Sequence, residues 1–447
     1  MTKKNPLPTT LPPERTLLVG VQITGEENLL PLDESLSELS LLSKTAGLNV
    51  VGTVEQRLRK PNPKTYIGTG KVDEVNALAE ELQAEIVLFD NELNPRHQRE
   101  LEAVFGDKVR VLDRTALILD IFAQHANTHE GSLQVELAQY EYRLPRLTRA
   151  WTHLARQAGG GGGRSGGGGV GLRGPGEKQL EVDRRDIHRR IDQLKVDLEK
   201  VRAHRSRHRV RRKKSRIPII SLVGYTNAGK STLLNRLAGA DVYVADQLFA
   251  TLDPTTRRVD LPGGTTALIS DTVGFIQKLP TELVAAFRAT LEEISEADLL
   301  LHVVDVTHQS AKFQAQAVIE TLKEIEADHI PLLTVLNKID RLDNIEMAKE
   351  SLAEFEDTVA ISALTGAGID DLLHNIHRKL FEAFEVISVR IPYSEGGLIA
   401  VFHEQGQVEQ VEHTRGGVVI DGRLPGRLVA QFSPYVISEM QVSGNLE

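Results

Sequence analysis

The spacing of apolar residues predicts an alternation of strands and helices in the first quarter of the chain. Between residues 16 and 125, short apolar runs alternate with segments of helical period, and the runs read TLLVGVQI, LNVVGTV, AEIVLFD and VRVLD. Strands that alternate with helices are typical of a parallel sheet covered by helices. We therefore predict an α/β domain with a parallel sheet over 16–125, preceded by a disordered tail over 1–15.

Two apolar stripes with heptad spacing follow this domain. Pro145 interrupts the first stripe and should kink the helix there. Two helices with matching stripes bury them most simply against each other, so we predict an antiparallel helical hairpin within 126–216. The stripe residues are Leu133, Leu137, Tyr140, Leu144, Leu147, Trp151 and Leu154, then Leu180, Ile187, Ile191, Leu194, Leu198 and Val201.

The segment between the two stripes, GGGGGRSGGGGVGLRGPGE over 159–177, allows two interpretations. Glycine has no Cβ and loses much backbone freedom on ordering, so the segment could be a flexible linker. In a hairpin, however, the glycine-rich loop over 159–176 lies at the tip, where a linker between domains is not needed. We favour a loop that reaches into another molecule, with the plain linker as the alternative.

A phosphate-binding motif lies at the start of the region 217–385. The run IPIISLVGYTNAGKSTLLNRL combines a strand, a GxxxxGKS loop and a helix. Gly224 and Gly229 let the backbone curl so that its N–H groups surround the α and β phosphates. Lys230 can reach the β and γ phosphates, and the hydroxyl of Ser231 can bind Mg²⁺. The motif predicts a Ras-like P-loop domain that binds a nucleoside triphosphate with Mg²⁺ as cofactor.

The base is predicted from the later run PLLTVLNKID. Asp340 can accept two hydrogen bonds from guanine N1–H and N2–H₂, whereas adenine would leave such a buried acceptor unpaired. We expect Asn337 to contact the purine edge and the stem of Lys338 to cover the ring. The run ISALTG supplies Ser362 and Ala363, whose backbone can meet guanine O6. The order and spacing therefore predict GTP as the substrate.

Two further motifs are predicted to respond to the γ-phosphate. In ALISDTVGF, we expect Asp271 to act on Mg²⁺ through a water and the N–H of Gly274 to sense the γ-phosphate. Thr251 in FATLDPTTR is the candidate that completes the Mg²⁺ shell. Phe275 stands where Ras-type enzymes carry a glutamine that orients the attacking water. A phenyl ring cannot do so, and we predict slow hydrolysis unless a partner or another residue of this chain assists.

The predicted site has three sets of residues. The catalytic residues are Lys230, Thr251 and Gly274, and the metal ligands are Ser231, Thr251 and Asp271. The residues expected to bind the nucleotide are Gly224, Tyr225, Thr226, Asn227, Ala228, Gly229, Lys230, Ser231, Thr232, Phe249, Ala250, Thr251, Leu252, Asp253, Asp271, Thr272, Val273, Gly274, Asn337, Lys338, Ile339, Asp340, Ser362 and Ala363.

The amino-acid composition and the distribution of charge predict a cellular compartment and a class of partner. The chain has no cysteine, which excludes disulfides and thiol catalysis, and no apolar run approaches the roughly 18 residues of a membrane span. We predict a soluble, cytoplasmic monomer. The net charge of −9 conceals a segment over 184–216 with 15 Lys and Arg against 4 Asp and Glu, so this segment carries +11 and the remainder −20. Such a cluster predicts a nucleic-acid partner, with a solvated charged helix face as the alternative.

Two other regions carry weaker signals. The run YIGTGKVDEV places Gly68, Gly70 and Lys71 before a helix, as an anion site or as a plain strand-to-helix turn. Residues 386–447 alternate short β-rich runs with turns, which predicts a small α+β or β appendage to which we assign no chemistry.

Together these motifs resemble the HflX family of ribosome-associated GTPases. The resemblance covers about 16–385 and depends on GYTNAGKS, FATLDPTTR, DTVGF, NKID and SALTG, and on the glycine-rich segment before them. It implies GTP hydrolysis coupled to binding of the large ribosomal subunit and its rRNA, and to splitting of stalled ribosomes under stress. It also implies that the glycine-rich loop points toward the peptidyl-transferase region.

Two functions remain open under this resemblance. One is ribosome splitting, and the other is a GTP-gated scaffold or checkpoint factor that binds rRNA during assembly of the large subunit. Members of the family have also been credited with ATP binding through the N-terminal domain, but no P-loop supports this within 16–125.

Overall fold

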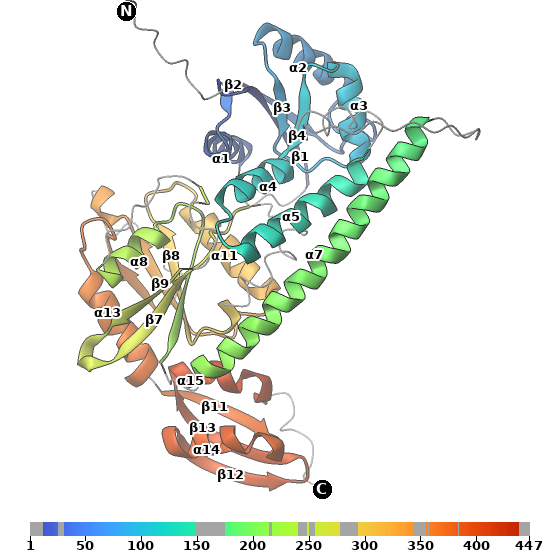
Figure 1. Ribbon diagram of the computed structural model, residues 1–447. Helices are drawn as coiled ribbons and strands as arrows, with labels where there is room; N and C mark the ends of the chain where they lie inside the picture. Colours follow the sequence, from blue (N-terminus) through green and yellow to red (C-terminus); the bar gives the residue numbers. More distant parts are fainter. Residues whose placement is uncertain are drawn as a thin grey trace, which may run out of the picture. The chain divides into compact units, whose positions relative to one another are not determined.

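The computed structural model describes most of the chain, which divides into two compact units (Figure 1). One unit comprises 1–205 and 279–286, and the other comprises 206–278 and 287–447. No helix within the described ranges is long and apolar enough to cross a membrane. The described residues are 12–25, 31–147, 175–213, 217–239, 248–249, 255–277, 294–342, 355, 357–382 and 384–437.

The first unit begins with a four-stranded parallel sheet in the order β2-β1-β3-β4. Every residue of the inner strand β3 is buried, as expected for a parallel strand with helices on both faces of its sheet. The parallel α/β fold predicted for this region is confirmed. Its elements are β1 Arg15–Ile23, α1 Leu32–Thr45, β2 Asn49–Leu58, α2 Thr69–Glu81, β3 Ile86–Phe89, α3 Pro95–Phe105, β4 Arg110–Asp113 and α4 Arg114–His125.

The segment YIGTGKVDEV forms the start of α2. Gly68 is the residue before the helix, and its N–H donates to Gln56 Oε1 at 3.1 Å. Lys71 Nζ lies 2.8 Å from Glu74 Oε2, one turn further along α2. The lysine charge is paired within the helix, which favours the plain strand-to-helix turn, and the anion site stays a prediction.

The two apolar stripes pack against each other, as predicted. The residues of the first stripe up to Tyr140 lie on α5, His129–Arg143, and the second stripe lies on α7, Pro175–Lys213. Helix α5 ends before Pro145, which lies in a 3-10 turn over Leu144–Arg146. The buried residues of this cluster are Leu133, Leu137, Ile191, Leu194 and Leu198, with Tyr140, Leu144, Ile187 and Val201 packed against them.

The direction of these two helices differs from the prediction. Arg190 donates two hydrogen bonds to Glu136 at 2.8 and 2.7 Å, and Lys195 Nζ lies 3.0 Å from Glu141 Oε1. The second pair lies five residues beyond the first on both helices, so α5 and α7 run parallel and the predicted antiparallel hairpin is wrong. A heptad stripe has the same spacing read in either direction, so it predicts which faces meet and not the direction.

The parallel arrangement requires a long connection between α5 and α7. Since Glu136 lies beside Arg190, the end of α5 lies beside about residue 197, and α7 begins at Pro175. At about 1.5 Å per residue, the connection must return over roughly 33 Å. The glycine-rich residues 159–174 and the stripe residues Trp151 and Leu154 lie outside the described residues, so the position of the loop stays a prediction.

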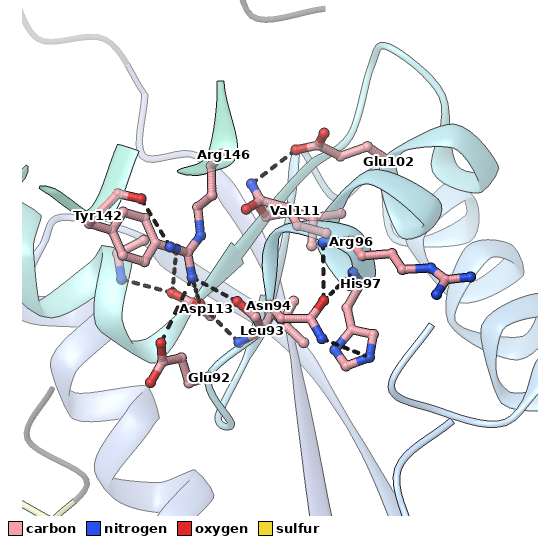
Figure 2. Close-up of polar contacts among 12 residues, drawn as sticks. Glu92, Leu93, Asn94, Arg96, His97, Glu102, Val111, Asp113, Tyr142 and Arg146 are labelled. Carbon is pink, nitrogen blue, oxygen red and sulfur yellow. Dashed lines mark hydrogen bonds and ion pairs between the residues drawn. The ribbon is translucent and has the colours of Figure 1, made fainter. Parts of the chain in front are cut away.

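A buried polar network joins the sheet to the end of α5 (Figure 2). Asp113, the last residue of β4, accepts hydrogen bonds from Tyr142 Oη at 2.7 Å, Leu93 N at 3.0 Å and Ala116 N at 2.9 Å. The guanidinium of Arg146 lies 3.6 Å from the centre of the Tyr142 ring and 3.6 Å from Asp113 Oδ2. Burial raises the pKa of Asp113, and these hydrogen bonds oppose the rise.

We expect Asp113→Ala to destabilise the first unit by about 3 kcal/mol, because it leaves the buried Arg146 without its nearest carboxylate. Hydrogen exchange of the β3 and β4 amides measures this local loss. The control is Glu136→Ala, which breaks the partly exposed pair with Arg190 and should cost less than about 1 kcal/mol. Equal exchange rates in the two variants would contradict the importance of the buried network.

The second unit begins with a six-stranded sheet in the order β10-β9-β8-β5-β7-β6, in which only the pair of β6 with β7 is antiparallel. This α/β architecture with a P-loop is the one predicted for 217–385. Its strands are β5 Ile219–Val223, β6 Thr255–Asp260, β7 Thr266–Asp271, β8 Leu299–Asp305, β9 Leu332–Asn337 and β10 Thr358–Ala360. Its helices include α8 Lys230–Ala238, α11 Ala311–Glu324 and α13 Ile369–His377, with 3-10 turns at Pro262–Gly264 and Ile339–Arg341 and a π turn at Arg378–Glu382.

The last part of the second unit is a small α+β domain, as expected for the appendage. Phe402 and Phe432 meet edge to face with their ring centres 5.5 Å apart, in a core between the sheet and its helices. The antiparallel sheet has the order β11-β13-β12. Its elements are β11 Phe384–Ile391, α14 Gly396–Gln405, β12 Gln407–Thr414, β13 Gly417–Pro425 and α15 Gly426–Phe432, with 3-10 turns at Tyr393–Glu395 and Ser433–Tyr435.

Candidate nucleotide-binding site

Most of the predicted site residues within the described ranges gather at one edge of the six-stranded sheet. The segment 224–232 follows β5, 271–274 begins at the last residue of β7, 337–340 begins at the last residue of β9, and 362–363 follows β10. These strands are parallel, so their carboxyl ends lie at the same edge, where ligands bind in open α/β sheets. The sheet therefore brings together motifs that are far apart in the sequence.

Two glycines of the P-loop are required by backbone shape and by close packing. Gly224 has a φ of +151°, and a Cβ there would lie 2.3 Å from Val303 O. Gly229 has a φ of +95°, and a Cβ there would lie 2.3 Å from Asn337 Nδ2. Any side chain at either position would clash, which explains both fixed glycines of the motif.

Lys230 is the first residue of α8 and is almost fully buried. Its Nζ donates to Gly224 O at 2.9 Å and to Tyr225 O at 2.8 Å. Burial lowers its pKa to about 8, and the negative charge of Asp271 partly opposes this. A buried ammonium beside the open N–H groups of a helix N-terminus suits an anion such as a polyphosphate.

Two of the three predicted metal ligands meet. Ser231 Oγ donates to Asp271 Oδ2 at 2.6 Å, although the residues are 40 positions apart. A hydroxyl and a carboxylate are the oxygen ligands that Mg²⁺ prefers, so this pair fits the ion. Phe249, which precedes the predicted third ligand Thr251 by two residues, is buried. Thr251, with Ala250, Leu252 and Asp253, lies outside the described residues.

The DTVGF segment is hydrogen-bonded to the P-loop. Phe275 N donates to Gly224 O at 3.1 Å, and Thr226 N donates to Phe275 O at 2.8 Å. A Cβ on Gly274 would lie 3.0 Å from Lys230 Nζ, so this glycine sits directly against the lysine of the P-loop. The Phe275 side chain is buried. The residue expected to sense the γ-phosphate thus lies next to the residue expected to bind it.

Asn337 connects two loops of the site. Its Nδ2 donates to Ala228 O at 2.8 Å, and its Oδ1 accepts from Ala363 N at 3.0 Å. Asn337 is 1% exposed, so its side chain is surrounded by protein atoms. The purine contact that we expected of Asn337 stays a prediction, whereas its joining of the P-loop to the SALTG loop was not foreseen.

Asp340 lies beside the SALTG loop, as the guanine hypothesis requires. Its Oδ1 accepts a hydrogen bond from Ser362 Oγ at 2.6 Å. Ile339 N donates to Ile361 O at 3.3 Å, which ties the two loops together through their backbones. Asp340 is exposed in the chain alone, in contrast to the buried acceptor that we expected, because it lies in a 3-10 turn beyond the end of β9.

Two residues at this edge were missed by the sequence analysis. Arg236 of α8 donates through Nε to Ala363 O at 3.1 Å and through Nη2 to Leu364 O. Asp305, the last residue of β8, lies 2.6 Å from Lys338 Nζ. Asp305 could have been predicted from the sequence, because it ends the apolar run of β8. Parallel neighbouring strands end at the same edge, so its carboxylate must lie at the same edge as Asn337.

Four family models match the chain in sequence order. A GTP-binding GTPase N-terminal model matches 33–123, and a GTP-binding GTPase middle region model matches 125–212. A 50S ribosome-binding GTPase model matches 219–338, and an HflX C-terminal domain model matches 347–432.

Curated relatives match nearly the whole chain. The GTPase HflX of Caldanaerobacter subterraneus subsp. tengcongensis is 43% identical over 425 residues, which is 95% of this chain and 94% of the relative. The GTPase HflX of Escherichia coli K12 is 44% identical over 414 residues, 92% of this chain and 94% of the relative. Among solved structures, the SsGBP and GDP complex is 26% identical, with a TM-score of 0.44 over 82% of this chain and 98% of that chain.

Proposed function

The chain belongs to the HflX family of GTPases, and from this premise we propose that it binds the large ribosomal subunit and splits stalled ribosomes by a GTP-dependent conformational change. The observation that supports a switch is the backbone pairing of Phe275 with Gly224 and Thr226. A γ-phosphate on the P-loop would lie beside this pairing, and its loss on hydrolysis would change the contacts of the DTVGF segment.

The site residues act on GTP in distinct ways in this proposal. The N–H groups of the loop from Gly224 to Gly229 bind the α and β phosphates, and Lys230 binds the β and γ phosphates. Ser231 and Asp271 would hold Mg²⁺, which would neutralise charge on the phosphate oxygens. A water attacks the γ-phosphorus as the bond to the bridging oxygen breaks, which gives GDP and phosphate, and a proton of the water passes to the phosphate or to solvent.

The rate of this reaction is expected to depend on the ribosome. Phe275 has no polar atom in its side chain with which to orient the attacking water, and its ring is buried beside the P-loop. Helix α7 extends to Lys213 and carries most of the segment of charge +11, which suits the phosphates of rRNA. In this proposal, contact with the large subunit supplies the group that orients the attacking water.

We predict that purified large subunits raise kcat for GTP by at least about tenfold, which corresponds to ~1.4 kcal/mol of barrier. Phosphate release measured with large subunits, with small subunits and with the protein alone tests this. Small subunits are the matched control for non-specific rRNA effects. Equal turnover in all three mixtures would count against activation by the large subunit.

The experiment that tests splitting uses intact ribosomes on sucrose gradients. With the protein and a non-hydrolysable GTP analogue, we expect the intact ribosome peak to fall and free subunits to appear, and with GDP we expect no change. The alternative function, a GTP-gated scaffold that binds rRNA in assembly, predicts protein bound to subunits without loss of intact ribosomes. That outcome would reject splitting.

A further inference from the structure

The carboxylate of Asp305 is held in one orientation by its own loop. Its Oδ1 accepts hydrogen bonds from Thr307 Oγ1 at 2.6 Å and from Thr307 N at 3.0 Å. The next residue, Val306, donates its N–H to Asn337 O at 3.2 Å, so the loop after β8 is also tied to the end of β9. These contacts orient the carboxylate without any help from Lys338.

The other oxygen of this carboxylate contacts the lysine of the NKID motif. Lys338 Nζ lies 2.6 Å from Asp305 Oδ2, and the two side chains are only 19% and 15% exposed. The same Nζ donates to Asn227 O in the P-loop at 2.9 Å. The ammonium of Lys338 is therefore fixed between the phosphate end of the site and the end of β8.

The backbone conformation of Lys338 links its contact with Asp305 to the position of the residues that follow. Lys338 has a φ of +70°, a left-handed conformation that is uncommon outside glycine and persists where surrounding contacts favour it. It immediately precedes the 3-10 turn Ile339–Arg341, which carries Asp340. Movement of Lys338 would thus move the turn that places Asp340 beside Ser362.

We propose that Asp305 is a positioning residue for guanine recognition, which acts by holding Lys338 over the base and thereby fixing the turn that carries Asp340. This inference rests on the proposed assignment of Asp340 as the reader of guanine. It adds to that assignment a carboxylate outside the NKID and SALTG motifs, placed by the strand order β8-β9.

The test replaces Asp305 by asparagine. The amide oxygen can still accept from Thr307, whereas an NH₂ group in place of Oδ2 would face the Lys338 ammonium, so two donors would oppose each other. We expect the Kd for GTP to rise about tenfold, and the preference for GTP over ITP to fall at least about threefold, because ITP lacks the 2-amino group that Asp340 would read. Equilibrium titration of the full chain with both nucleotides measures this.

A matched ion pair in the same unit provides the control. Lys379 Nζ lies 2.6 Å from Asp357 Oδ2. Asp357 precedes the amino end of β10, whereas the site motifs lie at the carboxyl ends of the strands. Asp357→Asn removes the same charge from a pair of the same length and should leave both Kd values within about twofold and the ratio of GTP to ITP unchanged. A loss of general stability in Asp305→Asn would weaken binding of GTP and ITP alike, without changing the ratio of their Kd values.

A double-variant comparison tests the route through Lys338. If Asp305 acts through the lysine, Asp305→Asn combined with Lys338→Ala should bind GTP no more weakly than Lys338→Ala alone. Full additivity would overturn the proposal. If Asp305→Asn fails to fold, Thr307→Val removes one of the bonds that orient the carboxylate and should shift the ratio of GTP to ITP in the same direction, by about twofold.

The variant Asp340→Asn separates failure of this inference from failure of the assignment on which it rests. If Asp340→Asn weakens GTP binding and Asp305→Asn changes neither affinity nor preference, the positioning role is wrong and the assignment stands. If Asp340→Asn also has no effect, guanine is read elsewhere, and both the assignment and the inference are overturned.

Discussion

Replacement of Asp340 by asparagine is expected to lower the affinity for GTP about 100-fold and to improve binding of xanthosine triphosphate. A carboxylate can accept from both N1–H and N2–H₂ of guanine, and each hydrogen bond to a charged group contributes about 1.5–3 kcal/mol. Asparagine presents one donor in place of one acceptor, and xanthine carries an oxygen where guanine carries the 2-amine, so the new pattern matches xanthine.

The local structure should tolerate this substitution. Ser362 Oγ donates to Asp340 Oδ1, and the amide oxygen of asparagine can accept the same bond. Asp340 is exposed, so no buried charge is lost. Titration with GTP and xanthosine triphosphate measures the change, with Asp357→Asn as the control for removing one negative charge from the same unit. Unchanged GTP affinity in Asp340→Asn would remove the base assignment.

The parts of the site that could be predicted from the sequence are those that the backbone itself requires. Gly224 and Gly229 have positive φ and would clash with Val303 O and Asn337 Nδ2 if they carried a Cβ. Only glycine satisfies these requirements at each of the two positions, so the motif can be recognised from the sequence alone. The α/β pattern was predictable for a similar reason, because buried parallel strands need continuous apolar runs.

The parts that could not be predicted depend on contacts between distant segments. Arg236 reaches Ala363 O across 127 positions, and no local pattern marks it. The apolar stripes predicted that α5 and α7 pack together, and they do, but their direction depends on which charges align, as Arg190 with Glu136 shows. The two ionic pairs along the helices carry this information, and an apolar period does not contain it.

Because α5 and α7 are parallel, a test of the glycine-rich loop must keep a connection long enough to join the two helices. We predict that replacing 159–174 by a short Gly-Ser turn leaves GTP binding intact but weakens binding to the large subunit or abolishes splitting. The retained residues 144–158 can span about 50 Å when extended, more than the roughly 33 Å between the helix ends, so the variant can still pair α5 with α7. Preserved GTP affinity would show that any lost splitting does not come from misfolding of the second unit.

The expected loss follows from the chemistry of the loop and of its surroundings. Glycines let the backbone approach bases and phosphates closely, and Arg164 and Arg173 add charge within the loop. Binding of the parent protein to large subunits should therefore weaken steeply between about 50 and 200 mM salt, measured by co-sedimentation. The variant Arg164→Ala with Arg173→Ala keeps the loop length and should lose part of this salt dependence. If the shortened protein binds and splits ribosomes as well as the parent does, residues 159–174 serve only as a connection, and the linker interpretation is correct.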